Sequence, residues 1–237
     1  MQRDILQTSP GVTLLLDPDN WPAEHLETLL GHPELRRAIH AIVVGGSYVH
    51  SERFAQTITL AAGRGLPLGT FLGAGPIDSL LSPQADFVLL PVAIGASSSR
   101  FLADHVLMAA PLIRRYRLGI CRIGYIQLQG GQPTSASFFT QVTPVPRDKP
   151  ELVETLALTA AYLGVHAIYL EAGSGASLPV TRDELRAAIR GSALPVFVGG
   201  GIRSLKECRQ LLSEGAHSVF VGSHVERTRS IEWLLHA

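Results

Sequence analysis

Eight short runs rich in Val, Ile and Leu recur along this 237-residue chain, and longer amphipathic stretches separate most of them. The runs are 12–17, 41–45, 66–72, 86–91, 122–128, 166–171, 194–198 and 217–222. Continuous apolar runs are typical of strands buried on both faces, as in a parallel sheet covered by helices. Helix-start signals, such as 181–184 (TRDE) and 204–207 (SLKE), lie between them. Eight such units predict a parallel, eight-stranded (β/α)8 TIM barrel.

The repeat is interrupted in two places. Residues 73–82 are short and rich in Gly and Pro, so we expect an irregular third βα unit there. Residues 129–148 form the longest polar insertion, and with two Phe and several Ser and Thr they predict an active-site loop. No shift in composition marks a boundary, and we expect residues 1–237 to form a single TIM-barrel domain.

Composition excludes several classes of partner and compartment. Lys plus Arg and Asp plus Glu number 20 each, so no basic surface for nucleic acid is expected. The two cysteines, Cys121 and Cys208, belong to no CxxC or metal-binding pattern, and no signal-peptide pattern is present, which predicts a reduced, cytoplasmic protein. No apolar run approaches the roughly 18 residues of a membrane span. The chain is therefore predicted to be soluble, which leaves a peripheral contact with lipid open.

Three glycine-rich turns follow three consecutive apolar runs near the C-terminus. They are 173–175 (GSG), 199–201 (GGG) and 222–223 (GS). Glycine lets backbone N–H groups approach an anion closely, and the turns lead into helices whose N-termini favour negative charge. One such turn alone is more often a plain strand-to-helix connection. Three in series predict a phosphate cradle.

Other polar residues end the predicted strands on the same side. Catalytic groups in such barrels lie at the C-terminal ends of the strands. Asp17, Ser47 and Glu171 end three of the runs, and Tyr125 lies within another. A carboxylate at the buried end of an apolar strand is costly unless it has a function or a partner, so Glu171 is the strongest candidate.

The order and identity of these segments resemble the geranylgeranylglyceryl phosphate synthase family. The matching segments are 16–19 (LDPD), 45–47 (GGS), 124–126 (GYI), 146–150 (PRDKP), 162–164 (YLG), 169–176 (YLEAGSGA), 199–204 (GGGIRS) and 222–223 (GS). They run in family order over nearly the whole barrel. The PRDKP and EAGSGA versions are similar to the subgroup found mainly in archaea and some bacteria.

The resemblance implies a Mg²⁺-dependent prenyltransferase that joins a polyprenyl diphosphate to the hydroxyl of sn-glycerol 1-phosphate, forming an ether-lipid precursor. It places the acceptor's phosphate on Gly200, Gly201, Gly222 and Ser223. It places the glycerol on Tyr169, Leu170, Glu171, Ala172, Gly173, Ser174 and Gly175. Asp17 and Ser47 match the family's magnesium positions. Because family members commonly form dimers or hexamers, we expect a homo-oligomer.

The chemistry of this transfer agrees with the residue types. Breaking a C–O bond to diphosphate places negative charge on the leaving group, which calls for a divalent cation and fixed dipoles. Asp17 is the best candidate magnesium ligand; Asp is also a common helix cap, so capping of a helix that begins at Pro18 is the alternative, and its family position favours the functional role. We expect Glu171 to accept the proton of the attacking hydroxyl and Tyr169 to orient the acceptor.

The chain departs from the family pattern on the side that would bind the prenyl donor. Asn20 stands where the family commonly has Lys, and 93–100 (AIGASSSR) replaces a Leu-Leu-Asn-Ser-x-Asn-Pro segment. Ser98, Ser99 and Arg100 are candidates to bind the donor's diphosphate; a helix-entry loop with a surface Arg is an equally good interpretation. The apolar residues of 101–108 that follow either line a prenyl tunnel or, as their spacing favours, form plain core.

Three alternatives stay open from the sequence. A related prenyltransferase of secondary metabolism would use 3-phosphoglycerate and a shorter prenyl diphosphate. A phosphate-binding barrel isomerase or lyase would use Asp17 and Glu171 as an acid/base pair. A non-catalytic barrel would keep only the phosphate cradle. Prenyl length, acceptor stereochemistry and the state of assembly are not determined by the sequence.

Overall fold

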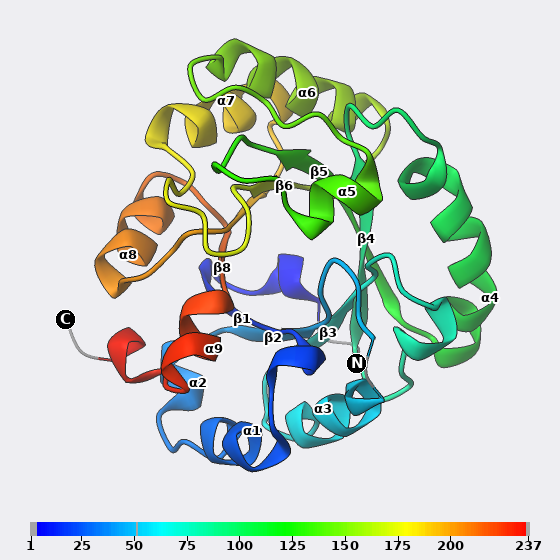
Figure 1. The fold of residues 1–237 in the computed structure, drawn as a ribbon, viewed down its shortest axis with the longest axis vertical. Helices are drawn as coiled ribbons and strands as arrows, with labels where there is room; N and C mark the ends of the chain where they lie inside the picture. Colours follow the sequence, from blue (N-terminus) through cyan, green and yellow to red (C-terminus); the bar gives the residue numbers. More distant parts are fainter. Residues whose placement is uncertain (1–3, 51, 236–237) are drawn as a thin grey trace.

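The computed structural model describes residues 4–50 and 52–235, and its eight strands close into a barrel (Figure 1). All neighbouring strands are parallel, in the order of the sequence, and β8 pairs back with β1. The strands are β1 (Gly11–Leu16), β2 (Ala41–Val44), β3 (Leu68–Phe71), β4 (Phe87–Ala93), β5 (Gly119–Gln127), β6 (Ala167–Glu171), β7 (Val196–Gly199) and β8 (Ser218–Val221). Each coincides with one of the eight apolar runs, so the predicted TIM barrel is confirmed.

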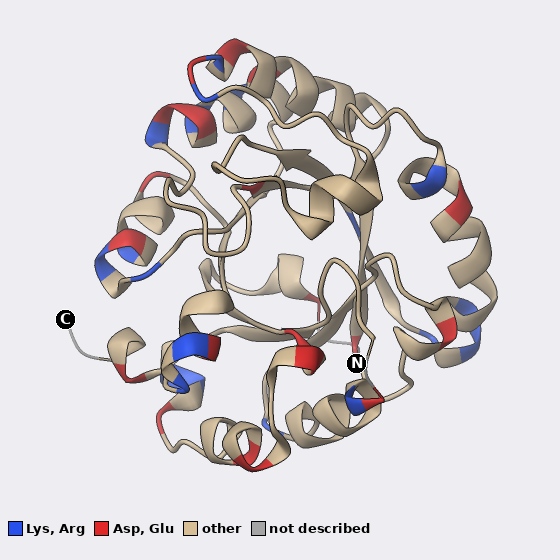
Figure 2. Cartoon of the chain, viewed as in Figure 1, with Lys and Arg blue, Asp and Glu red and all other residues tan. Residues whose placement is uncertain are grey.

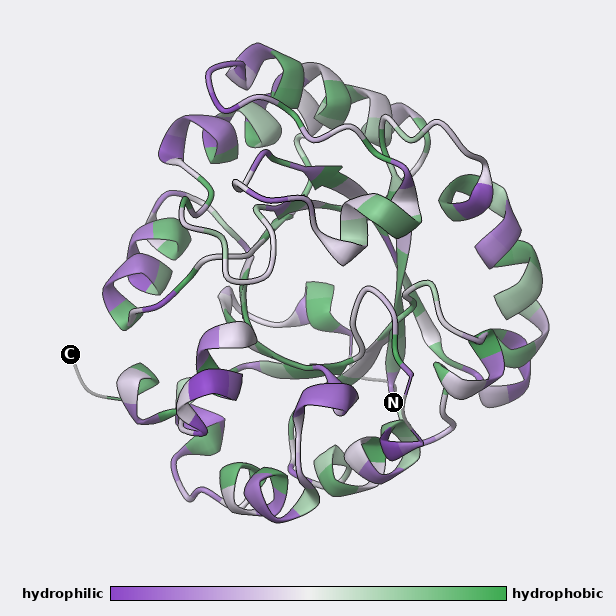
Figure 3. Cartoon of the chain, in the orientation of Figure 1, coloured by the Kyte–Doolittle hydropathy of each residue, from purple (hydrophilic) through white to green (hydrophobic). Residues whose placement is uncertain are grey.

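Helices surround the barrel, except for α5, which lies inside their ring in Figure 1. The helices are α1 (Ala23–Leu30), α2 (Leu35–Ala38), α3 (Arg53–Ala61), α4 (His105–Tyr116), α5 (Ser135–Thr140), α6 (Pro150–Tyr162), α7 (Arg182–Ser192), α8 (Leu205–Ser213) and α9 (Ser223–Thr228). Charged residues lie mainly on this outer layer and on the loops (Figure 2). Hydrophobic residues, green in Figure 3, lie along the strands and on the helices where they pack on the barrel. Burial of the sheet on both faces requires this arrangement. Within the described ranges, no helix is both long and apolar enough to cross a membrane.

The predicted helix starts are capped as the sequence indicated. At α7, the Thr181 hydroxyl accepts from the Glu184 N–H at 3.3 Å, and the Glu184 carboxylate accepts from the Thr181 N–H at 2.8 Å. Ser204 and Glu207 make the same reciprocal pair at α8. Each box satisfies two backbone donors that a helix start would otherwise leave unpaired.

Both predicted interruptions of the repeat are present. Between β3 and β4 the chain forms only a short 3-10 turn, Ile77–Ser79, because the Gly and Pro residues around it cannot sustain a helix. The 129–148 insertion is more ordered than a simple loop, since it contains α5 and bridges back to β5 through Leu128 and Val145.

Two hydrophobic layers hold the barrel. Outward-facing strand residues pack against the helices, while inward-facing residues fill the interior. Phe197 is fully buried in that interior, with its ring centroid 5.6 Å from that of Phe220 and 5.8 Å from that of His217. Below them Ile5, also fully buried, packs in the same cluster.

We expect Phe197→Ala to lower the free energy of unfolding by about 3–5 kcal/mol, because it leaves a cavity in a closed interior that cannot collapse. Leu107→Ala is the matched control, since Leu107 is 75% exposed on α4, and it should cost no more than about 0.5 kcal/mol. Urea denaturation of both variants measures the difference. Equal losses would mean that the interior layer is not the main source of stability.

Candidate active site

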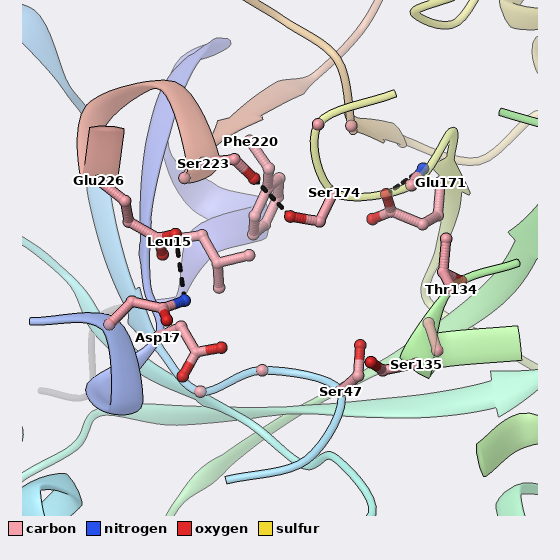
Figure 4. A pocket seen from close by; sticks show the side chains of 18 of the residues that line it. Leu15, Asp17, Ser47, Thr134, Ser135, Glu171, Ser174, Phe220, Ser223 and Glu226 are labelled. Atoms are coloured by element: carbon pink, nitrogen blue, oxygen red, sulfur yellow. Dashed lines mark hydrogen bonds between the residues drawn. The ribbon is translucent and has the colours of Figure 1, made fainter. Parts of the chain in front are cut away.

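A cavity of about 460 Å³ opens at the C-terminal ends of the strands (Figure 4). Its wall comes from the ends of β1, β2, β5, β6, β7 and β8, together with α5 and α9. The sequence-predicted residues on this wall are Asp17, Ser47, Tyr169, Glu171, Gly173, Ser174, Gly175, Gly200, Gly201, Gly222 and Ser223. The barrel thus brings the predicted acceptor and metal residues together around one space.

Leu170 and Ala172 do not share this position. Both are buried in the layer between the strands and the helices. Successive residues of a strand point to opposite faces, so Leu170 points away from the barrel interior while Tyr169 and Glu171 point toward the cavity. Leu170 and Ala172 therefore do not present their side chains to the cavity, and contact of this part of the 169–175 segment with the glycerol stays a prediction.

Glu171, the last residue of β6, is held by two hydrogen bonds. Its Oε1 accepts from the Gly173 N–H at 2.6 Å, and its carboxylate accepts from the Tyr169 hydroxyl. Burial raises the pKa of Glu171 to about 7, although both hydrogen bonds lower it. Burial also raises the pKa of Tyr169, so that its hydroxyl stays protonated and remains a donor. A carboxyl group with a pKa near neutrality is suited to accept and return a proton.

The glycine turn after β7 packs directly on this carboxylate. Gly200 has a φ of +88°, and a Cβ there would lie 2.7 Å from Glu171 Oε1 and 2.6 Å from the Gly173 nitrogen. Gly201 has a φ of +74°, and a Cβ would lie 2.9 Å from the Ala176 carbonyl oxygen. Only glycine fits both the left-handed conformation and the space. The close approach leaves backbone, rather than side chains, facing the cavity.

The turns after β6 and β8 meet between Glu171 and Glu226 on the cavity wall (Figure 4). Ser174 Oγ and Ser223 Oγ are 2.6 Å apart and hydrogen-bonded (Figure 4). Arg203 lies on the same wall and donates to the carbonyl oxygens of Gly175 at 3.3 Å and Ala176 at 2.9 Å. Backbone amides, hydroxyl groups and a guanidinium around one space are the donor types that bind a phosphate.

Asp17 faces the cavity from the side opposite Glu171 (Figure 4). Its Oδ1 accepts from the Asp19 N–H at 3.1 Å and caps the turn Pro18–Asn20, so the capping role also holds. Its Oδ2 lies against Gly46, where a Cβ would approach it to 2.7 Å. Burial raises the pKa of Asp17 to about 6, and the charge of Asp19 adds to that effect.

Glu226 of α9 adds a second carboxyl group near Asp17. Its Oε2 accepts from the Asn20 side-chain amide at 3.2 Å. Burial raises the pKa of Glu226 to about 7, and the charge of Asp17 raises it further. Glu226 lies one helical turn after Ser223, a spacing that places both on one helix face and could have identified it from the sequence.

The oxygen donors at this end of the cavity suit Mg²⁺ better than zinc. Among residues 4–50 and 52–235, no three His, Cys, Asp or Glu side chains converge as a metal-binding group. Magnesium needs only one or two carboxylates, because water and substrate phosphates complete its shell. Asp17 and Ser47, which both line the cavity, would be its protein ligands.

The three donor-side candidates lie off the cavity wall. Arg100 donates to the Ala74 carbonyl at 2.9 Å and to His105 Nε2 at 3.2 Å. The Ser99 hydroxyl donates to Asp104, and Ser98 Oγ accepts from the Arg100 N–H. The guanidinium is thus engaged by the fold itself, and a role for Ser98, Ser99 and Arg100 in binding diphosphate stays a prediction.

The apolar segment after Arg100 does not form plain core as its spacing favoured. Phe101 is buried, but Leu102, Leu107 and Met108 are 46%, 75% and 65% exposed. These three side chains lie on the surface of α4 and the turn before it, because the face of α4 that packs on the barrel is formed instead by residues such as Ala109 and Ile113.

The cavity wall also contains residues that the sequence did not identify. They come from the loops after β2, β5 and β7 and from α5 and α9, and include Tyr48, His50, Thr134, Ser135, Phe139, Arg203, His224 and Arg227. Tyr48 stacks on Phe139 with ring centroids 4.8 Å apart, which joins the β2 loop to α5. No pattern of spacing signals such a contact between loops that are distant in sequence.

Comparison with known proteins points to one family. The PcrB family model matches residues 4–236. A protein of Spirosoma linguale named geranylgeranylglyceryl phosphate synthase is 33% identical over 90% of this chain and 85% of its own length. A protein of Korarchaeum cryptofilum with the same name is 35% identical over 79% of this chain and 76% of its own length.

Solved structures agree with these matches. The crystal structure of (S)-3-O-geranylgeranylglyceryl phosphate synthase from Thermoplasma acidophilum, in complex with its substrate sn-glycerol-1-phosphate, superposes with a TM-score of 0.85 at 25% identity, covering 97% of this chain and 92% of that one. The tryptophan synthase α-subunit of Pyrococcus furiosus, at a TM-score of 0.58 and 13% identity, shares the barrel fold alone.

We expect the wild-type protein to lose stability as pH rises from about 5 to 8 in the absence of divalent cations. The folded pKa of Glu171, about 7, lies above its unfolded value of 4.5, so the folded state binds more protons in this window and is weakened when they leave. Glu171→Gln removes that cost and should show a shallower decline. Urea midpoints at both pH values measure it; identical slopes would place the folded pKa of Glu171 near its unfolded value.

Proposed function

The chain belongs to the PcrB family, and we propose that it is a prenyltransferase that joins a polyprenyl diphosphate to the hydroxyl of sn-glycerol 1-phosphate, yielding an ether-lipid precursor. The relatives named for this activity match most of the chain. The observation that carries the proposal is Glu171, a hydrogen-bonded carboxyl group with a pKa near neutrality, packed against a glycine cradle. A phosphorylated alcohol placed in that cradle presents its free hydroxyl to a base.

The acceptor is fixed by its phosphate. Backbone N–H groups of Gly200, Gly201 and Gly222, with the Ser223 hydroxyl, would bind the phosphate oxygens, and the turn 173–175 would enclose the glycerol. The Ser174–Ser223 hydrogen bond supports this arrangement, because it ties the two turns together before any ligand arrives. Donors fixed in advance lose little freedom on binding.

The reaction forms one C–O bond and breaks another. The acceptor oxygen attacks C1 of the prenyl chain, the bond from C1 to the diphosphate oxygen breaks, and diphosphate leaves with the electron pair. Glu171 takes the proton of the attacking hydroxyl as the new ether bond forms. The Tyr169 hydroxyl, which donates to the same carboxylate, holds that carboxylate in one orientation.

Magnesium belongs to the donor side of this proposal. Asp17 and Ser47 would hold it, and when bound it would neutralise the charge that develops on the departing diphosphate. The two carboxyl groups with raised pKa at this end, Asp17 and Glu226, support a cation there. Asp17 would also keep the cation apart from Glu171, because the two face the cavity from opposite sides.

The state of assembly and the cellular location are also part of the proposal. We expect a homo-oligomer, a dimer or a hexamer, that works in the cytoplasm and at most touches lipid peripherally.

Incubation with Mg²⁺ and C10 to C35 prenyl diphosphates, separately with glycerol 1-phosphate, glycerol 3-phosphate and 3-phosphoglycerate, tests the reaction by mass spectrometry. We expect a prenyl ether of glycerol 1-phosphate. A product from 3-phosphoglycerate alone would identify the related enzyme of secondary metabolism. Binding of glycerol 1-phosphate with no ether from any pair would leave only the non-catalytic barrel.

Glu171→Gln should lower kcat by about 10²–10⁴-fold, because the amide cannot accept a proton. The wild-type rate should fall as pH drops through about 7, since the carboxyl group is then protonated. Glu27→Gln, which alters an exposed carboxylate of α1, is the control and should behave as wild type. A rate that does not depend on pH between 5 and 8, with activity retained in Glu171→Gln, would exclude Glu171 as the base.

Chelation of divalent cations should abolish turnover, and added Mg²⁺ should restore it. Asp17→Asn should raise the Mg²⁺ concentration needed for half-maximal rate, because an amide is a poorer magnesium ligand than a carboxylate. The same requirement should rise in the wild type as pH falls through about 6, where Asp17 becomes protonated. Asp78→Asn, an exposed position, serves as control. An unchanged Mg²⁺ requirement in Asp17→Asn would remove Asp17 from the metal site.

A further inference from the structure

Arg147 reaches from the 129–148 insertion to the loop that joins β6 to α7. Its guanidinium donates to the carbonyl oxygens of Leu178, at 3.4 Å, and Pro179. Its Nε lies 3.3 Å from Oε1 of Glu184 on α7. The Glu184 side chain is 2% exposed and that of Arg147 16%, so this ion pair is almost wholly removed from solvent. It lies outside the set of residues that line the cavity.

A buried ion pair is a poor device for stability alone. Removing both charges from water costs free energy that their attraction repays only with good geometry, and apolar replacements are often as stable. Here the ion pair fixes the orientation of the Glu184 carboxylate relative to the loop that Arg147 contacts. The Oε1 atom of Glu184 forms the ion pair with Arg147. Its Oε2 atom caps α7 by accepting from the Thr181 N–H at 2.8 Å. One carboxylate therefore fixes both the end of the loop and the start of the helix.

The loop held in this way carries the acceptor turn. Gly173, Ser174 and Gly175 line the cavity, and Leu178 and Pro179 follow within a few residues. From the cavity side, Arg203 donates to the carbonyl oxygens of Gly175 and Ala176. Arg203 thus binds two carbonyl groups at the end of the turn, and Arg147 binds two more a few residues later in the same short loop. Fixed carbonyl groups set the peptide planes that directly follow the 173–175 turn, and so hold its C-terminal end in place.

We propose that Arg147 is a positioning residue for the acceptor: through Leu178, Pro179 and Glu184 it holds the 173–175 turn in the geometry that binds a glycerol phosphate. The inference rests on the proposed function. It also gives the insertion a second role, because the segment whose α5 lines the cavity braces the acceptor loop from behind. Loss of the Arg147 side chain should weaken acceptor binding and leave donor binding intact.

The test compares four variants in the full-length protein. Arg147→Gln removes the charge and the fork of donors. Arg147→Lys keeps the charge but cannot reach both carbonyl groups and Glu184 together. Glu184→Gln removes the ion pair and keeps an oxygen to cap Thr181. Arg190→Gln is the matched control, because Arg190 lies at the other end of α7 from Glu184 and makes an exposed ion pair with Glu154 of α6.

Two readouts separate positioning from plain stability. Hydrogen exchange of the backbone amides of 173–180, without substrate, should accelerate in Arg147→Gln and Glu184→Gln. The KM for glycerol 1-phosphate should rise about tenfold in Arg147→Gln, since a turn displaced by a fraction of an ångström loses oriented contacts. The KM for the prenyl diphosphate should stay unchanged. Arg147→Lys should be intermediate, and Arg190→Gln should match wild type in every readout.

Other outcomes overturn the inference. Unchanged exchange in 173–180, or a KM that rises equally for both substrates, would mean that Arg147 only stabilises the fold. If Arg147→Gln does not fold, Arg147→Lys and Glu184→Gln decide by the same criteria. Failure of the wild-type protein to bind glycerol 1-phosphate in calorimetry would reject the proposed function instead, while the exchange data would still show whether Arg147 holds the loop.

Discussion

Closure of eight parallel strands is the constraint on which the rest of this molecule depends. Because every strand runs the same way, every C-terminal end opens on one rim, and residues as distant in sequence as Asp17 and Glu171 face one cavity. The same closure buries the strands on both faces and explains why an ionisable group at a strand end is perturbed. Burial, more than any single neighbouring charge, raises the pKa of Asp17, Glu171 and Glu226.

The sequence predicts most of this fold because each strand corresponds to a short apolar run. The helix starts could be predicted because their capping interactions are local, as in the reciprocal pair of Thr181 and Glu184. The strand ends also indicated the position of the cavity, because a closed barrel of parallel strands brings all their C-terminal ends together at one rim. The glycine turns of the cavity wall could be located from the sequence because their conformations depend little on distant contacts.

What the sequence could not predict depends on tertiary contacts. Arg100 is a candidate for diphosphate by residue type, yet the Ala74 carbonyl and His105 engage it. Leu107 and Met108 have the spacing of core residues, but α4 packs on the barrel through another face. In each case the deciding partner lies far away in sequence, beyond the reach of periodicity.

The site is divided along the chain, and the division has an evolutionary consequence. The turns proposed to bind the acceptor all lie between residues 169 and 223, at the ends of three successive strands, whereas Asp17 and Ser47 follow the first two strands. The segment that departs most from the family pattern, 93–100, lies between these halves and contributes nothing to the cavity wall. Substitutions in 93–100 can therefore accumulate without altering any residue that lines the cavity.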